Sequence, residues 1–425
     1  MNNAAPALLA LVLVCALPAM TVVAAGPTTD TAVSQTAGSV SDPLETSSTA
    51  DTVGQTQLQH LSAMIEIEDS TNRLTIGDEG QRLYTSPTPA FESTISIADD
   101  DLRTDHHRFA FEEQFVDNPD QRAELIEEYH AIVRDRIQVL NEREQRAVTA
   151  HAAGEASDEE VLRAFYRNYN EANDLAAFLT ELEIAAGQVS GYSLRDEARE
   201  TRNKLDAHRS ELRSELDGTR EPARSGQFTV ETNDVGYRVS AIVGDRYLHE
   251  VQRFDLREPD SEDQIGSLGD WDDYVDTLYP WALANADGAS INRLADYQLY
   301  RADIAHPQGD LDAFVDGATE QVTREHQELF LSTLPREPTE TWEEGDLEVR
   351  LNATPGFGPT ELTVVDAESG EPVDATISVD GSEIGTTDED GALWIAPPTG
   401  DYELTVETPS ETVNVTVEGV AEGSG

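Results

Sequence analysis

The sequence has almost no cysteine and almost no lysine. Its only cysteine, Cys15, lies inside an apolar run near the start of the chain. If that run is removed, the remaining chain has no thiol, which excludes disulfides and cysteine nucleophiles. Its only lysine is Lys204, so 27 of the 28 basic residues are arginines. Stability must therefore come from packing and from salt.

The motifs of several common enzyme classes are also missing. The sequence has no His-Glu-x-x-His zinc helix, no Gly-x-Ser-x-Gly nucleophile elbow, no Gly-x-x-x-x-Gly-Lys-Ser/Thr phosphate loop and no dinucleotide-binding glycine run. Carboxylate pairs are abundant only because carboxylates are abundant, so they are no evidence for acid–base catalysis. We therefore assign no catalytic residue, no cofactor and no metal ligand, and we lean toward a protein that is not an enzyme.

Acidic charge dominates the composition. The chain has 84 acidic and 28 basic residues, which gives a formal net charge of −56. Such an excess repels itself in dilute buffer, because the Debye length grows from roughly 3 Å at 1 M salt to 30 Å at 0.01 M. Nucleic acid and anionic membrane surfaces are poor partners for this field. The high acidic content and the scarcity of lysine resemble the proteins of extreme halophiles, in particular haloarchaea, and this resemblance implies a fold that depends on salt.

The first sixty residues predict export. An apolar run from Ala4 to Ala25 ends in small residues of the kind that an export peptidase cuts after. We interpret residues 1–25 as a cleaved signal peptide, with an uncleaved N-terminal anchor as the alternative, because the run approaches the roughly 20 residues that span a bilayer. Residues 26–60, rich in Thr, Ser, Ala and Asp, predict a disordered stalk. We expect a secreted or cell-surface protein that meets the membrane only through this first segment.

Three long amphipathic segments in 120–217 indicate a helical bundle or hairpin. Apolar residues recur every three or four positions, which places them on one stripe of each helix. Ser157 and Glu160 have the spacing of a capping box at the start of the second helix. The third helix is expected to run unbroken from a cap at Ser193 to Leu216. Each helix is too polar to stand alone, so its stripe must face another helix or a partner.

These segments belong to a predicted helical domain, residues 61–219. Within it, residues 61–97 are expected to pack along the bundle. A further helix is expected over 99–115, with four apolar residues: Leu102, Phe109, Phe111 and Phe115.

Histidines near acidic residues are the first candidates for a metal site. His106 and His107 are followed by Glu112 and Glu113. Adjacent residues point to different sides of a helix and no spacing fixes a further ligand, so we interpret this group as a solvated helix face. His208, on the apolar stripe of the third helix, is interpreted as a packed histidine rather than a ligand.

In the predicted central domain, residues 226–340, apolar residues recur at every second position instead of every third or fourth. This change predicts an α+β module with an antiparallel sheet. We expect one helix over 270–283 and strands over 228–231, 237–243, 247–254, 297–304, 311–315 and 320–331.

Part of this module, residues 297–331, resembles the strand, turn, strand signature of PepSY-type domains. The resemblance rests on the run from Gly309 to Thr323, and it departs from the pattern at Glu320, where a glycine is usual. It implies an inhibitor or folding factor of the cell envelope.

A second alternative is an envelope hydrolase with a site in the 270–330 region. Aromatic residues such as Trp271 and the scattered His249, His306 and His326 would then line a cleft. A deep pocket with converging histidines and carboxylates would favour this enzyme, whereas a solid core would exclude it.

Short alternating strands separated by Gly, Pro and Asp turns predict an all-β sandwich over 345–418. The stretches 370–381, 385–391 and 398–406 resemble the carboxypeptidase-regulatory-like, transthyretin-like family. This resemblance implies an accessory β-sandwich of exported and surface proteins rather than a catalyst.

Three polar features of this sandwich deserve a functional interpretation. Asp388 and Asp390 cluster oxygen atoms that suit calcium, but we favour a plain hairpin turn. Asn352 and Asn414 each begin an N-glycosylation triplet.

A short tail, residues 419–425, follows without a second apolar run, so we expect no C-terminal membrane helix.

The predicted architecture is multidomain α+β: an N-terminal long-helix bundle or hairpin, a central α+β module with an antiparallel sheet, and a C-terminal all-β sandwich. The whole chain resembles a family of uncharacterised exported proteins of haloarchaea, and that resemblance implies location but no activity. We favour a halophilic, non-enzymatic interaction protein of the cell envelope or extracellular space, in which the helices act as a spacer. Its expected partners are envelope or extracellular proteins.

Overall fold

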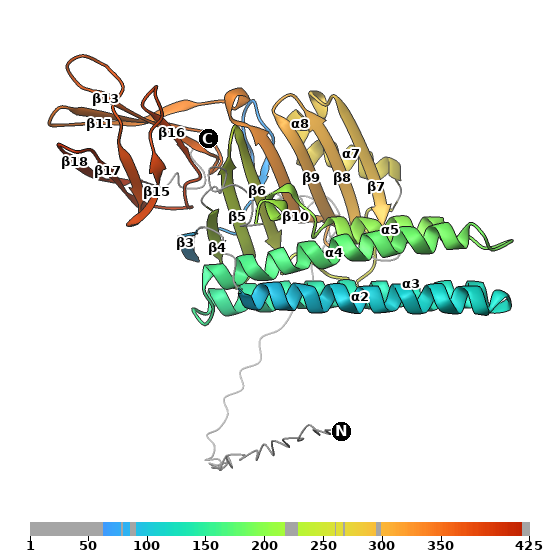
Figure 1. Cartoon of the computed structure of the whole chain (residues 1–425). Coiled ribbons are helices and arrows are strands. Elements are labelled where there is room, and N and C mark those ends of the chain that lie inside the picture. Colours follow the sequence, from blue (N-terminus) through green and yellow to red (C-terminus); the bar gives the residue numbers. More distant parts are fainter. Residues whose placement is uncertain are drawn as a thin grey trace, which may run out of the picture. The chain divides into compact units, whose positions relative to one another are not determined.

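The computed structural model describes residues 63–77, 80–85, 91–216, 228–259, 261–266, 268–294 and 299–418. All of them belong to one compact unit, residues 50–425. The predicted signal segment, stalk and tail lie outside the described residues. The multidomain α+β class predicted from the sequence is confirmed, with helices, an antiparallel central sheet and a C-terminal β domain (Figure 1).

Three long helices pack side by side: α2 (Phe91–Asp117), α3 (Arg122–Ala152) and α4 (Asp158–Ala186) (Figure 1). Their shared core contains an aromatic group in which Phe111, Tyr129 and Phe178 meet edge to face. A short 3-10 turn, η2 (Pro119–Gln121), joins α2 to α3. Because α2 packs on α3 and α4 rather than on the sheet, its other face is left for solvent.

The local helix signals were only partly predictive. The capping box is confirmed, because Glu160 N donates to Ser157 Oγ and Ser157 N donates to Glu160 Oε2 at 2.8 Å. The prediction of one unbroken third helix was wrong. It is split into α5 (Arg195–Asp206) and α6 (Glu211–Ser214), and Leu194 rather than Ser193 occupies the N-cap. Ser210 starts α6 by accepting from Arg213 N, and its hydroxyl also donates to Glu250 of the sheet at 2.5 Å.

The central sheet has eight strands in the order β3-β4-β5-β6-β10-β9-β8-β7, and every neighbouring pair is antiparallel. The strands are β3 (Gln81–Thr85), β4 (Phe228–Thr232), β5 (Gly236–Val243), β6 (Arg246–Arg253), β7 (Gly288–Leu294), β8 (Leu299–His306), β9 (Gly309–Asp316) and β10 (Gln321–Phe330).

The two faces of the sheet are covered by different elements. Apolar residues of α3, α4 and α6 pack on one face, on strands β4 to β6. On the other face lie α7 (Leu268–Leu278) and α8 (Pro280–Ala284). Pro280 interrupts the single helix predicted for 270–283, because proline removes an amide donor and opens a new helix at its first position.

Residues 63–77 lie on the sheet face that carries α7 and α8. They form a two-stranded pair, β1 (Met64–Ile65) and β2 (Arg73–Leu74), and Leu74 is buried in that core. The prediction that residues 61–97 pack along the bundle was therefore wrong for 63–77. The backbone amide of Leu74 donates to the Glu325 carboxylate at 3.1 Å, which fixes this segment to β10.

The C-terminal domain is a sandwich of two four-stranded sheets, β11-β12-β13-β16 and β15-β14-β17-β18, around one apolar core. The strands are β11 (Glu337–Glu344), β12 (Leu347–Ala353), β13 (Thr360–Asp366), β14 (Thr376–Val379), β15 (Ser382–Thr386), β16 (Ala392–Ile395), β17 (Tyr402–Glu407) and β18 (Thr412–Val417).

Hydrogen bonds join the sandwich to the central sheet. Thr229 Oγ1 donates to Ala396 O at 2.7 Å, and Thr399 N donates to Glu231 Oε1 at 2.7 Å. No helix among the described residues has both the length and the apolar character that a bilayer crossing requires.

Candidate functional site

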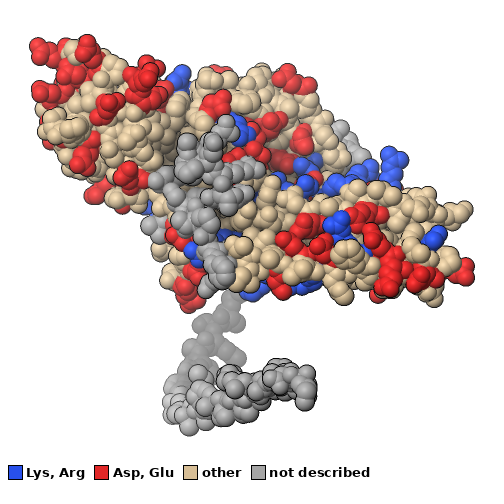
Figure 2. All heavy atoms as spheres, in the orientation of Figure 1, with Lys and Arg blue, Asp and Glu red and all other residues tan. Residues whose placement is uncertain are grey.

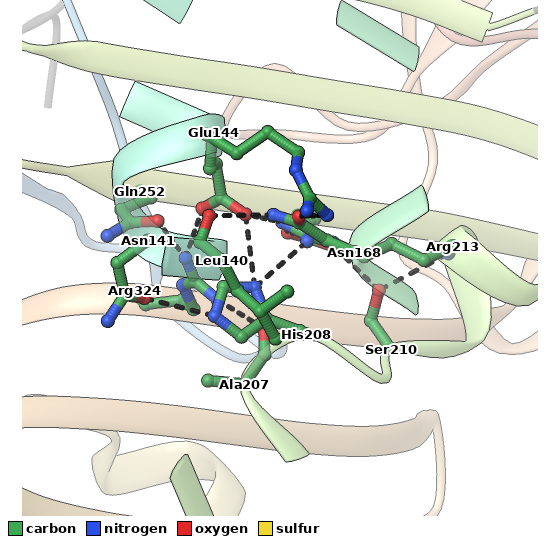
Figure 3. Close-up of polar contacts among 12 residues, drawn as sticks. Leu140, Asn141, Glu144, Asn168, Ala207, His208, Ser210, Arg213, Gln252 and Arg324 are labelled. Atoms are coloured by element: carbon green, nitrogen blue, oxygen red, sulfur yellow. Dashed lines mark hydrogen bonds and ion pairs between the residues drawn. The ribbon is translucent and has the colours of Figure 1, made fainter. Parts of the chain in front are cut away.

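A buried polar group joins the helices to the sheet, and we call it the junction network. Its side chains come from α3, the α5–α6 region and strands β5, β6 and β10: Glu144, His208, Ser210, Arg213, Tyr237, Glu250 and Arg324. Figure 3 shows several of them converging between α3 and the α5–α6 connection. All seven are buried, which is unusual for charged residues unless they are paired.

Two carboxylates and two guanidinium groups form the centre of the junction network. Arg213 Nη2 lies 2.7 Å from Glu144 Oε2 and 2.6 Å from Glu250 Oε1. Arg324 contacts the other oxygen of Glu144 and also Gln252. The hydroxyl of Tyr237 donates to Glu250 at 2.6 Å. The charges balance locally, so each buried ion has a partner, as burial requires.

The pKa values agree with a network whose carboxylates are charged at pH 7. Burial raises the pKa of Glu144, but Arg213 and Arg324 outweigh it and hold this pKa well below its usual range. The pKa of Glu250 falls to about 2 because the neighbouring Arg213 outweighs the effect of burial. Burial lowers the pKa of His208 to about 4, so this histidine is neutral at pH 7. The network therefore joins the helices to the sheet through paired charges.

A cavity of about 720 Å³ opens beside the junction network, and we call it the junction cavity. Glu144 and Arg324 belong to both. Its walls come from α3, from Lys204 and Ala207, and from the sheet region that includes Gln252, Phe254, Arg257, Leu299 and Phe314. Figure 2 shows basic side chains gathered along the boundary between sheet and helices, on a surface where acidic side chains otherwise predominate.

The three histidines of the hydrolase hypothesis do not converge. His249 faces Ser240 and stacks on Tyr247, on the sheet face that points away from α3 and α4. His306 packs edge-on against Trp281, and His326 lies against Phe314.

None of these histidines lines the junction cavity. Trp271 is fully buried in a solid core. The lining predicted for a cleft over 270–330, with Trp271 and these three histidines, is therefore not found among the described residues, although Leu299, Phe314 and Arg324 of that region line the junction cavity.

The remaining predicted residues are dispersed. His106 is exposed and His107 is partly buried near Tyr129, whereas His208 is fully buried and lies 3.0 Å from Asn141. Over the residues that the structure describes, no three His, Cys, Asp or Glu side chains are grouped so that they could hold a metal ion.

The polar residues of the sandwich lie on its strands and turns. The carboxylate of Asp388 accepts from the backbone amides of Asp390 and Ala392 at 3.0 Å, as in a turn. Asn414 is exposed on β18 and Asn352 is partly buried on β12.

One surface feature of α2 was missed by the sequence reasoning. Ile95, Leu102, Phe109 and Val116 are 54–70% exposed and follow one another at intervals of seven residues. Seven residues are close to two helical turns, so these side chains form one line, which we call the α2 stripe. Leu102 and Phe109 were predicted as part of the same apolar set as Phe111, yet only Phe111 and Phe115 turn into the bundle.

The α2 stripe is flanked by acid. Its exposed neighbours include five carboxylates, Asp99, Asp105, Glu112, Glu113 and Asp117, of which Asp99 pairs with Arg103 and Asp105 pairs with Arg108 on the same helix. The signal that could have found the stripe is the interval of seven itself, which differs from the mixed three and four spacing of a helix that packs in a bundle.

The junction network was also missed. In the alternating strand 246–253, Glu250 lies two residues after Leu248, so both side chains point to the same face of the sheet, and Leu248 packs under the helices. A charged residue at an inward-facing strand position needs a buried partner, so the position of Glu250 in the strand is the sequence signal that could have predicted the network. In a chain with 84 acidic residues the signal is weak.

Three family models match the chain in sequence. The domain of unknown function DUF7096 matches residues 1–225, the family of unknown function DUF7094 matches residues 228–335, and the archaeal fibronectin-III type-like domain matches residues 338–415. The comparison with curated proteins and the comparison with solved structures gave no match.

These matches revise two resemblances. They support the C-terminal β-sandwich but describe it as archaeal fibronectin-III type-like, so the carboxypeptidase-regulatory-like and PepSY-like resemblances are not confirmed. Because the first model covers more than half of the chain, the protein belongs to the family described as domain of unknown function DUF7096.

Proposed function

We propose that this protein is an exported, non-enzymatic binding protein of the cell envelope or extracellular space, and that it docks a helix of another protein on the α2 stripe. The observation that carries the proposal is the row of four large apolar side chains on the face of α2 that points away from its own bundle. Contiguous exposed apolar surface on a folded protein marks an interaction site.

The spacing of the stripe suits a helix as its occupant. A repeat of seven residues is the repeat of a coiled-coil seam, in which each apolar side chain inserts between residues of the facing helix. From Ile95 to Val116 the stripe extends over about 32 Å of helix, at about 1.5 Å per residue. Covering each side chain contributes roughly 1–2 kcal/mol, since each is already partly shielded by its own helix.

The charge beside the stripe selects the kind of helix. A second copy of the chain would bring the acidic residues that flank the stripe against one another, and like charges across such a seam oppose pairing. A partner helix with arginine or lysine beside its apolar seam would meet them with opposite charge. We therefore infer a basic-flanked amphipathic helix as the partner.

Export and salt dependence belong to the same proposal. They are supported by the apolar run at residues 4–25, by the lack of cysteine after it, and by the net charge of −56 with a single lysine. The archaeal fibronectin-III type-like match at 338–415 supports an accessory β-sandwich beside the helices.

A synthetic peptide tests the docking directly. The peptide is a heptad-repeat helix with leucine along its seam and arginine beside it, and its binding to the full chain is followed by fluorescence anisotropy at moderate salt. We expect binding that weakens at least tenfold in the double variant Leu102→Gln, Phe109→Gln, because two anchors of roughly 1 kcal/mol each are lost.

The chain offers a matched control for this peptide experiment. Ile184 on α4 is 64% exposed, so Ile184→Gln removes a comparable apolar side chain outside the stripe and should leave binding unchanged. A peptide with glutamate in place of arginine should bind far more weakly. Equal loss in the control and the double variant, or a dimer of the free protein by light scattering that the double variant abolishes, would refute the proposed occupant.

A further inference from the structure

The junction cavity has the size and lining of a small-molecule site. Its volume of about 720 Å³ lies within the roughly 300–1,000 Å³ of ligand pockets. Ile137 and Phe254 contribute apolar surface from the helix and from the sheet, and Leu299 and Phe314 extend it. A ligand with a flat apolar body would therefore be covered on both sides.

The net charge of the cavity lining is positive, whereas that of the whole chain is negative. Acidic residues outnumber basic ones by 84 to 28 in the whole sequence. The cavity lining instead contains four basic residues and only two acidic ones, Asp135 and Glu144. Glu144 is neutralised within the junction network by Arg213 and Arg324.

The basic residues of the lining differ in how far they are already paired. Lys204 pairs with Glu200, Arg257 pairs with Asp316, and Arg324 pairs with Glu144. Arg134 is exposed on α3 and makes no ion pair with any residue that the structure describes. It is therefore the cation that a ligand can recruit without breaking an existing pair.

The junction network also leaves one hydrogen-bond donor beside the cavity. Arg324 can only donate, so the Gln252 atom that it contacts must be the amide oxygen. The amide nitrogen of Gln252 has no acceptor among the described residues, and Gln252 lines the cavity. Figure 3 shows Gln252 beside Asn141 and Arg324 at this edge of the network.

We infer that the junction cavity binds a small organic anion, a carboxylate or sulfonate on a flat apolar body. The acidic group accepts from the Gln252 amide near the junction network, the positive charge of Arg134 at the rim attracts it across the cavity, and the body lies between Ile137 and Phe254. This site is separate from the α2 stripe, so either proposal can fail without the other.

Two fluorescent probes of nearly the same shape test the inference. 1-Anilinonaphthalene-8-sulfonate carries the anionic group, and N-phenyl-1-naphthylamine has the same ring body without it. Both are titrated into the full chain at high salt, with the native fold checked by circular dichroism. We expect one saturable site for the anion, with affinity at least about fivefold above that of the neutral probe, because a charge-assisted hydrogen bond is worth more than about 1 kcal/mol.

Variants assign the site. Arg134→Gln should lower the affinity for the anionic probe about fivefold and leave the affinity for the neutral probe unchanged. Arg146→Gln is the matched control, because Arg146 is exposed on the same helix but lies outside the cavity lining. The double variant Leu102→Gln, Phe109→Gln should also leave both probes unchanged.

Three results would overturn the inference. The first is an absence of saturable binding, and the second is equal affinity for both probes together with no effect of Arg134→Gln. The third is loss of the anion signal in the double variant, which would move the binding to the α2 stripe.

Discussion

Replacing Glu144 by glutamine removes one of the two carboxylates that neutralise Arg213 and Arg324 in the junction network. Glu144→Gln keeps the size of the side chain, but its amide nitrogen then faces a guanidinium group, donor against donor. Glu250 remains as the only carboxylate for two buried cations. Breaking a buried ion pair by removing one partner costs about 3–5 kcal/mol, because the remaining charge is left without compensation.

The assay is urea unfolding at high salt, followed by circular dichroism, with Glu128→Gln as the control. Glu128 is exposed on α3 and takes part in no ion pair with the described residues, so its replacement should change the free energy of unfolding by less than about 0.5 kcal/mol. We expect Glu144→Gln to lower that free energy by about 3–5 kcal/mol at pH 7. A loss below about 1 kcal/mol would refute the view that this network holds the helices on the sheet.

Acid should shrink the difference between the wild type and Glu144→Gln. The folded-state pKa of Glu144 is depressed below its ordinary 4.5, so its contribution is fully present above pH 4.5 and is lost as the pH falls toward the folded pKa. The two proteins should therefore differ less at pH 3 than at pH 7, and a difference that grows with acid would contradict the charged network.

Three further predictions concern other parts of the chain. Dialysis into salt-free buffer should lower the helicity seen by circular dichroism, because 84 acidic side chains are then hardly screened; an unchanged spectrum would count against salt dependence. Burial raises the pKa of Glu325 to about 7, so its contribution to stability is present below pH 4.5 and is lost as the pH rises through 7. As the pH rises from 4.5 to 8, the free energy of unfolding of Glu325→Gln, measured in urea, should therefore rise by about 3 kcal/mol relative to that of the wild type. Parallel pH profiles of the two proteins would show that the pKa of Glu325 is not raised. Ser157→Ala should lower the free energy of unfolding by about 1 kcal/mol through loss of the capping box, whereas Ser193→Ala, outside an N-cap, should change it little.

Local sequence patterns predicted those helices and strands that bury an apolar face. The alternation in 237–243 and 247–254 predicted β5 and β6, because strands packed under helices need apolar residues at every second position. Strand β7 and strand β11 were not predicted. Each lies at the end of its sheet, and β11 is mostly exposed, so its alternating pattern is weak.

The candidate sites could not be predicted because they depend on packing between distant segments. The apolar residues of α2 were visible in the sequence, but only the positions of α3 and α4 decide that Phe111 is buried while Phe109 stays exposed. Glu144 and Arg324 are separated by 180 residues, and nothing local pairs one carboxylate among 84 with one particular arginine. The junction cavity likewise forms only where α3 and the sheet come together.

Photo-crosslinking from the α2 stripe in cells that produce the protein tests the central claim most directly. A benzophenone amino acid replaces Phe109 in one variant and Ile184 in a control, and mass spectrometry identifies the segment attached to each. The account predicts an adduct from position 109 only, on an amphipathic helix of another envelope or extracellular protein with basic residues beside its apolar seam. No adduct at position 109, or an adduct to a second copy of the chain, would contradict it.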